Sequence, residues 1–171
     1  PFEDRTASFA PMSVFEPRST GVIADSRWTM TPYVGYEHML AYTAVHVERH
    51  APAGEGNAVI ESGELVFEPR LRFESSRVRG FGGIYLFRAD QDDEIDLLGG
   101  GAFDDRTRTV AGFGEVVITA APRLDVTVGA RLEREHRRRS GADGPFTIDF
   151  DETYNVFSPK AGVQWRASDA I

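Results

Sequence analysis

The sequence contains no cysteine and only one lysine, Lys160, among its 171 residues. The absence of cysteine excludes disulfide frameworks, thiolate metal sites and cysteine nucleophiles. Arginine carries nearly all of the positive charge, and the formal net charge is −8. Such an acidic balance argues against a nucleic-acid partner, because phosphates are bound by concentrated lysine and arginine.

Long apolar runs are also missing. No stretch approaches the roughly 18 consecutive apolar residues of a transmembrane helix, and residues 1–5 lack the apolar segment of a signal peptide. A transmembrane β-strand, however, needs only about 9 to 11 residues in which every second one is apolar. The composition therefore leaves a membrane β-barrel open.

The clearest pattern lies between residues 123 and 135, where apolar and polar side chains alternate. The apolar positions are Leu124, Val126, Val128, Ala130 and Leu132. Because successive side chains of a strand point to opposite sides, a period of two predicts a long β-strand. Its apolar face would fit either a soluble core or lipid.

Other alternating segments predict six more strands, over residues 26–37, 39–48, 64–74, 78–89, 109–119 and 157–167. A joint near Glu37 and His38 separates the first two. Residues 1–25 contain three prolines and predict a loop, with at most a short strand near residues 12–15. The fold class predicted is all-β.

The predicted connections alternate in length. Short ones fall near residue 37 and at residues 75–76 and 120–123, and long ones at residues 49–63, 90–107 and 137–152, where residues 146–150 are a candidate strand extension. In an antiparallel up-and-down meander, alternate connections lie at opposite ends of the sheet. Outer-membrane barrels have short turns at one rim and longer loops at the other. A soluble β-sandwich with long loops at one end would give much of the same pattern.

Two segments contain side chains of the types that bind metal ions. The stretch Asp90–Asp96 places carboxylates close together, as calcium requires, but Ile95 stands where the sixth-position glycine of an EF-hand loop would be. A solvated loop is the preferred interpretation. His46 and His50 are four residues apart, which separates them by about 13 Å on a strand. No metal or cofactor site is predicted.

Two charged sets are candidates for binding. His136–Arg139 lies at the end of the sixth predicted strand, where it either binds lipid phosphates or pairs with Asp143, Asp149 or Asp151. A second set shares the polar faces of the strands and either contacts a ligand or forms cross-strand ion pairs. Its members are Arg70, Arg72, Glu74, Arg131, Glu133, Lys160 and Arg166. Catalysis is not predicted, because no nucleophile elbow or phosphate loop is present and Ser158 precedes a proline within a strand.

Several short sequence motifs resemble motifs of the β-barrel domain of TonB-dependent outer-membrane receptors. Residues 113–116 (FGEV) followed by residues 124–135 resemble the family's hairpin of an FGE/FGQ strand and an LTxGxRYxxE strand. Residues 157–165 followed by Ser168 resemble its SPKxGxxY strand and turn, and residues 67–73 with 83–87 are similar to its QELRL and GxYYF pair. The resemblance covers residues 60–171 well and the first 60 poorly.

This resemblance implies energised uptake of a scarce nutrient, such as an iron–siderophore complex, across the outer membrane of a Gram-negative bacterium. The implied partners are outer-membrane lipid and lipopolysaccharide, the TonB energising complex and a small ligand. No plug domain or TonB-box peptide is recognisable, and seven strands do not close a single-chain barrel. Residues 1–171 are therefore interpreted as part of one larger barrel domain, which the missing N-terminal part would connect to TonB. The alternatives are a soluble all-β binding module and a passive porin or adhesin barrel.

Overall fold

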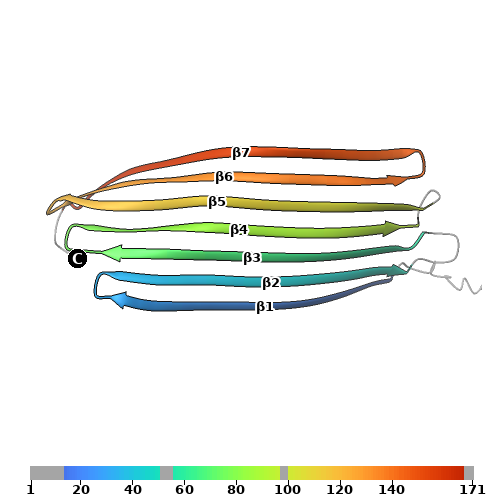
Figure 1. Cartoon of the computed structure of the whole chain (residues 1–171), viewed down its shortest axis with the longest axis horizontal. Coiled ribbons are helices and arrows are strands. Elements are labelled where there is room, and N and C mark those ends of the chain that lie inside the picture. The colour runs from blue at the N-terminus through green and yellow to red at the C-terminus, as the bar shows by residue number, and fades with distance from the viewer. Residues whose placement is uncertain (1–13, 51–55, 97–99, 168–171) are drawn as a thin grey trace, which may run out of the picture.

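The protein is a single antiparallel sheet of seven strands that follow one another in chain order (Figure 1). The structure, a computed structural model, describes residues 14–50, 56–96 and 100–167. This confirms the predicted all-β meander of about seven long strands. The described residues contain no helix that could span a membrane. The strands are β1 Val14–Thr31, β2 Val34–His50, β3 Ala58–Glu74, β4 Val78–Ile95, β5 Gly101–Ala121, β6 Leu124–Asp143 and β7 Phe146–Trp165.

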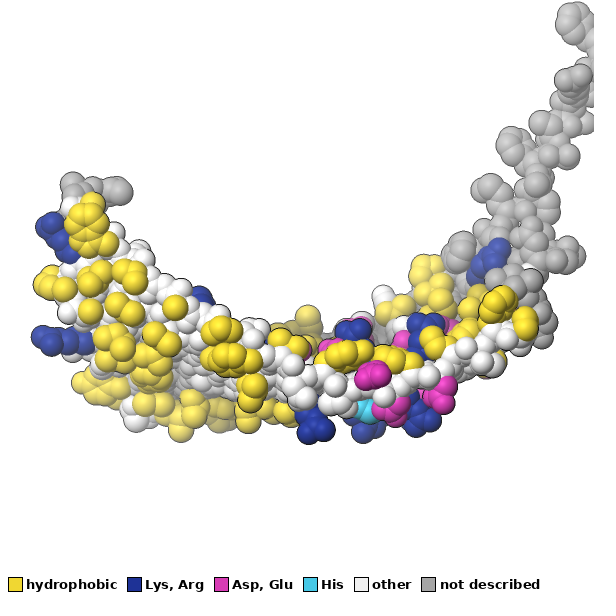
Figure 2. Space-filling model, turned by 90° about the horizontal axis from the view of Figure 1, so that it is seen from above, with side chains coloured by type: hydrophobic (Ala, Val, Ile, Leu, Met, Phe, Trp, Pro, Cys, Tyr) yellow, Lys and Arg dark blue, Asp and Glu magenta, His cyan; other side chains and the backbone are white. Residues whose placement is uncertain are grey.

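The sheet is bowed and forms one layer (Figure 2). Ala111 is the only buried hydrophobic residue of the described chain, so no soluble-type core is present there. Residues directly opposite each other in a ladder point to the same side. By this register the most enclosed residues, Asp93, Thr109, Ala111 and Asp125, share one face. We call this the inner face and the opposite side the outer face.

The first hairpin turns at Pro32 and Tyr33, so the predicted joint near Glu37 and His38 is wrong. The Thr31 hydroxyl accepts hydrogen bonds from the backbone N–H groups of Tyr33 at 3.2 Å and Val34 at 3.0 Å. The apolar parity continues through the turn, because Trp28 of β1 lies directly opposite Tyr36 of β2. The alternation of apolar residues continues without a break across the turn, and the sequence pattern therefore did not predict its position.

The strand β1 begins at Val14, within the stretch predicted as loop. Pro17 lies within this strand, opposite Val47 of β2. The remainder of the predicted loop, residues 1–13, lies outside the described residues.

Two of the three predicted long loops, at residues 90–107 and 137–152, are mostly strand, and of the predicted loop at residues 49–63 the part from Ala58 belongs to β3. Strand β4 continues to Ile95 and β5 begins at Gly101, while β6 continues to Asp143 and β7 begins at Phe146, which confirms the extension over residues 146–150. The turn between β6 and β7 uses Gly144, whose φ of 55° is the left-handed region that glycine favours. In the extensions of β4 and β6 both faces are largely polar, so the alternation that predicts a strand disappears there, whereas in β7 the apolar Phe146, Ile148 and Phe150 still alternate with polar residues.

Candidate functional site

An apolar band covers the outer face next to the short turns. It spans nine residues of each strand, and it comprises the outward residues of 22–30, 34–42, 65–73, 78–86, 110–118, 124–132 and 157–165. All of these are apolar, aromatic or glycine except Ser26 and His38, and none carries a carboxylate, lysine or arginine. A transmembrane strand needs about 9 to 11 residues. The band therefore has the height of a bilayer core.

Many apolar side chains of this band are exposed. Val128 is 56 % exposed, Leu132 62 % and Val163 72 %. Aromatic residues gather at its turn end, where the rings of Trp28 and Tyr36 lie 6.4 Å apart. Figure 2 shows hydrophobic side chains toward one end of the sheet and charged ones toward the other. Exposed apolar surface flanked by aromatic residues is typical of the lipid-facing wall of a membrane barrel.

The edge of the band that lies farther from the short turns runs obliquely across the strands. Its last apolar residue is Val22 on β1, whereas on β7 it is Phe157, which lies four residues nearer the turns in register. With a rise of about 3.3 Å per residue and strands about 4.8 Å apart, this slope corresponds to a strand tilt of about 25°. A tilt is required of strands that close into a barrel.

The only two polar residues of the band are paired with each other. Ser26 and His38 lie directly opposite in the β1–β2 ladder, and the Ser26 hydroxyl is 3.1 Å from Nδ1 of His38. The His38 ring also packs near Tyr36 at 5.6 Å and Phe67 at 6.2 Å between centroids. Both polar groups thus find a partner without water.

The inner face carries charges at the same height as the band. Glu37 on β2 is a shared acceptor: its carboxylate lies 3.1 Å from Arg27, 3.5 Å from Arg72 and 3.9 Å from Arg70. These contacts link β1, β2 and β3. Arg70 also pairs with Glu68 of its own strand, as Arg131 does with Glu133 at 2.6 Å.

Two further contacts connect strands that are not neighbours. Lys160 of β7 reaches Glu115 of β5 at 2.5 Å, across Gly129 of β6. Asp125 of β6 accepts from Thr119 at 2.7 Å and from Arg79 of β4 at 3.3 Å, and Arg166 lies 3.6 Å away. The inner face is therefore a polar wall tied together by shared carboxylates.

All seven charged residues predicted to share the polar faces lie on the inner face. Arg70, Arg72, Lys160 and Arg166 make ion pairs between strands, whereas the Arg131–Glu133 pair lies within one strand. The sequence reading missed the two shared acceptors, Glu37 and Asp125. Both stand at polar positions of alternating strands, and that parity was the only available signal for them.

A cationic and aromatic cluster lies in the middle of the inner face. The Arg70 guanidinium lies 5.5 Å from the ring centroid of Phe113, and that of Arg131 lies 4.8 Å from the ring of Tyr85 and 6.0 Å from that of Phe113. Gly83 leaves room for this arrangement, since a Cβ there would lie 2.8 Å from Phe113 Cζ. The cluster presents rings and guanidinium groups to whatever occupies the inside of the sheet.

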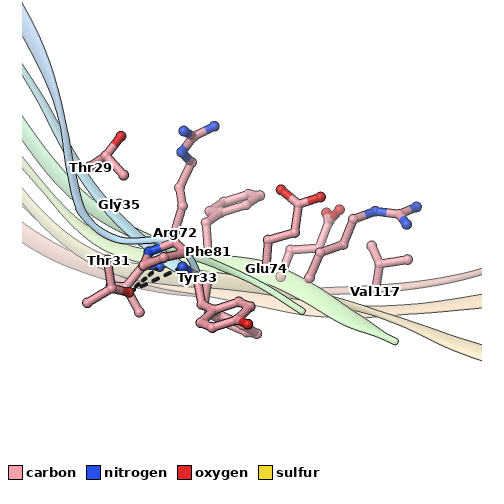
Figure 3. A pocket seen from close by; sticks show the side chains of 14 residues that line it. Thr29, Thr31, Tyr33, Gly35, Arg72, Glu74, Phe81 and Val117 are labelled. Carbon is pink, nitrogen blue, oxygen red and sulfur yellow. Dashed lines mark hydrogen bonds between the residues drawn. The ribbon is translucent and has the colours of Figure 1, made fainter. Parts of the chain in front are cut away.

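A depression of about 410 Å³ lies beside the β1–β2 turn (Figure 3). Its lining comes from both faces of the sheet: Arg72 and Glu74 extend to one side of the ribbons and Tyr33 to the other. A space shared by the two sides of a single layer is not an enclosed binding site. We therefore assign no ligand to it.

The acidic segment predicted as a solvated loop is part of a strand. Asp90–Asp96 is strand β4 up to Ile95 and not a loop, so neighbouring carboxylates point to opposite faces: Asp90 pairs with Arg88, and Asp93 lies on the inner face near Arg139. No group of three metal-ligating side chains occurs in residues 14–50, 56–96 and 100–167.

His46 lies on the outer face beyond the band. Its Nε2 is 2.9 Å from Glu48 and its Nδ1 is 3.0 Å from Glu61. The hydrogen bond to Glu48 is the main cause that raises the pKa of His46 above its ordinary value, and Glu61 adds to it. The side chain of His50 lies outside the described residues.

The basic cluster His136–Arg139 is divided between the two faces. On the outer face, His136 lies 3.1 Å from Thr153 and 3.6 Å from Asp151. On the inner face, Arg137 pairs with Glu135 at 2.6 Å, and Arg139 lies 3.5 Å from Asp105. The predicted pairing within the protein thus holds for Asp151, while Arg138 points outward.

The comparisons with known proteins agree with this geometry. The family described as TonB dependent receptor-like, beta-barrel matches residues 18–171. A similar solved structure is the ferric yersiniabactin uptake receptor FyuA from Yersinia pestis, with a TM-score of 0.74 and 16 % sequence identity. The match covers 95 % of this chain and 28 % of that receptor chain. The seven strands thus have the fold of a part of such a barrel.

Proposed function

The chain belongs to the family of TonB-dependent receptor β-barrels, and on this basis we propose that it is one segment of the wall of a receptor that imports a scarce nutrient. The family is one of the outer membrane of Gram-negative bacteria, so this is an outer-membrane protein. Its fold is that of a transport receptor and not of an enzyme. Residues 1–171 would all belong to the same barrel domain.

One observation carries the proposal: a lipid-height apolar band and a charged wall occupy opposite faces of the same strands. The band excludes charge over nine residues of every strand, while Glu37, Arg70 and Arg72 form ion pairs on the other face. A polar interior behind an apolar exterior is the arrangement of a barrel with a water-filled or plugged lumen. A soluble binding module would leave the apolar face uncovered in water.

We propose a ferric siderophore as the cargo, and a TonB-type complex as the source of energy. FyuA, which shares this fold at 16 % identity, is by its name a ferric yersiniabactin uptake receptor. The inner wall offers Arg70 and Arg131 beside the ring of Phe113, a combination suited to anionic and aromatic chelates.

The test is uptake by the full-length receptor in cells that lack the gene and starve for iron. Radioactive ferric chelates of catecholate, hydroxamate and phenolate type should be offered with and without a functional TonB complex. Accumulation of at least one chelate that requires both the receptor and TonB is expected. Uptake that continues without TonB would instead indicate a passive pore, and no uptake of any chelate would reject the siderophore assignment.

A further inference from the structure

A basic patch lies on the outer face directly above the apolar band. Strands β4, β5 and β6 place nine outward residues there in three rows: Leu86, Val110 and Arg134, then Arg88, Arg108 and His136, then Asp90, Arg106 and Arg138. Five of these nine are arginine and one is histidine, against one aspartate. This local excess of positive charge stands out in a chain of net charge −8.

Basic residues of this patch lie directly opposite one another in the ladders. Arg108 lies directly between Arg88 and His136 in the ladder. Arg106 lies directly opposite Arg138. Like charges in directly opposite positions destabilise a sheet unless something neutralises them.

The carboxylates near the patch are already engaged. Asp90 pairs with Arg88 at 2.6 Å, Asp104 with Arg106 at 2.7 Å, and Asp151 lies 3.6 Å from His136. Within the described ranges 14–50, 56–96 and 100–167, no carboxylate lies within 4 Å of Arg108, Arg134 or Arg138, although Asp151 is the ladder neighbour of Arg138. All three arginines are exposed.

The position of the patch along the strands indicates which layer of the membrane it contacts. Arg134 follows Leu132, the last apolar residue of the band on β6, and Arg108 precedes Val110, the last one on β5. At the opposite end the strands stop at short turns beside the band, whereas here they continue beyond it to Ile95 and Asp143. In outer-membrane barrels the extended end is extracellular. The patch therefore lies at the headgroup level of the outer leaflet.

We propose that Arg108, Arg134 and Arg138, supported by Arg88, Arg106 and His136, bind the phosphate groups of an outer-leaflet lipopolysaccharide. The acyl chains of the lipid cover the band below, and the guanidinium groups hold the phosphorylated sugars above it. Guanidinium forks bind phosphate through paired, charge-assisted hydrogen bonds. The bound phosphate removes the repulsion between the opposed arginines. The patch adjoins the exposed apolar band, so one lipid molecule contacts both.

The strand β6 provides a matched control. Arg137 lies between His136 and Arg138 in sequence but points to the inner face, where it pairs with Glu135. R108Q/R134Q/R138Q removes three charges from the lipid side, whereas R137Q removes one at the same height from the other side. R108K/R134K/R138K keeps the charge and removes the forks.

The test uses the full-length receptor in nanodiscs that contain either phosphorylated lipid A or its chemically dephosphorylated form, with binding measured by native mass spectrometry and titration. The wild type and R137Q should bind phosphorylated lipid A alike and at least about tenfold more tightly than the dephosphorylated form. R108Q/R134Q/R138Q should lose this preference, and the lysine variant should keep part of it.

Three results would overturn the proposal. These are equal binding of the two lipids by the wild type, an unchanged preference in R108Q/R134Q/R138Q, and an equal loss in R137Q. If inorganic pyrophosphate displaces the lipid completely at similar concentration, the site is one for free phosphate and the lipid assignment is rejected. If the glutamine variant does not assemble, the proposal is tested by the affinities of the wild type and of the lysine variant for the two forms of lipid A. The assay measures lipid and not cargo, so its result is independent of the uptake test.

Discussion

Ser26 and His38 are the only polar side chains in the apolar band, and they lie directly opposite each other with the hydroxyl 3.1 Å from the imidazole. A polar group that faces lipid has no water to replace a lost partner. The two residues are therefore expected to depend on each other, and their pairing stabilises the first hairpin within the membrane.

The first prediction concerns this pair. S26A should destabilise the assembled receptor by about 0.6 kcal/mol and at most about 1.7 kcal/mol, the range measured for hydrogen bonds in membranes. S26A/H38L should be less destabilised than the sum of the single variants, because the double variant leaves no polar group unpaired. Urea unfolding of the full-length receptor in lipid vesicles measures this. Strictly additive effects would show that the hydrogen bond is not maintained in lipid.

The second prediction tests the assignment of the two faces on β6. Val128 lies at the middle of the band, whereas the adjacent Thr127 points to the inner face. V128R should cost about 2 to 4 kcal/mol, and T127R should stay within about 0.5 kcal/mol of the wild type. The amount of receptor assembled in outer membranes and its unfolding in urea report the difference. Equal effects of the two variants would mean that the faces are assigned wrongly.

The third prediction concerns the contact of Lys160 with Glu115 across Gly129. Lys160 is largely exposed, so a double-mutant cycle of K160M and E115Q should give a coupling of only about 0.2 to 1 kcal/mol, which falls as salt rises. G129V should abolish the coupling, because its side chain would stand between the two charged groups. G162V, on the same face of β7, is the control and should leave it intact. A coupling that survives G129V would contradict the proposed path.

The fourth prediction concerns the titration of His46, which lies beyond the band. Its pKa is raised first by the hydrogen bond to Glu48 and then by Glu61, so it should exceed the ordinary value of 6.5. Because the folded pKa is the higher one, the stabilising contribution is complete below pH 6.5 and is lost as the pH rises through the folded pKa. NMR titration of the imidazole should show a larger fall in pKa for E48Q than for E61Q. The reverse order would contradict the assignment of the main partner.

The sequence predicted the part of the sheet that faces two different media. From Leu124 to Leu132 the outward side meets lipid and the inward side meets charge, so alternation is enforced at every position and the strand is visible. Beyond the band, residues such as Asp90 and Arg106 meet a polar medium on both sides. Apolar and polar side chains do not alternate there, so the sequence pattern did not predict these parts of the strands.

Two further features of the candidate site could not be predicted from the sequence pattern. The parity across Pro32 continues from Trp28 to Tyr36 because a two-residue turn returns the chain onto the same face, so the hairpin read as one strand. The basic cluster His136–Arg139 read as one feature, whereas the pleat of β6 separates Arg137 from Arg138 and directs them to opposite sides of the wall. Which arginines remain without a carboxylate depends on the register with β5 and β7, and a single strand does not contain that information.

The order of the strands has a consequence for biogenesis. Each strand from β2 to β6 pairs with the strands that precede and follow it in the chain, so every ladder can form as soon as the next hairpin arrives. The wall can therefore be assembled by successive addition, with the loop-closure entropy of only one short connection to overcome at each step. A variant that stops one hairpin from forming should halt the addition at that point and leave a nascent edge exposed to proteases, while the strands already in place remain protected.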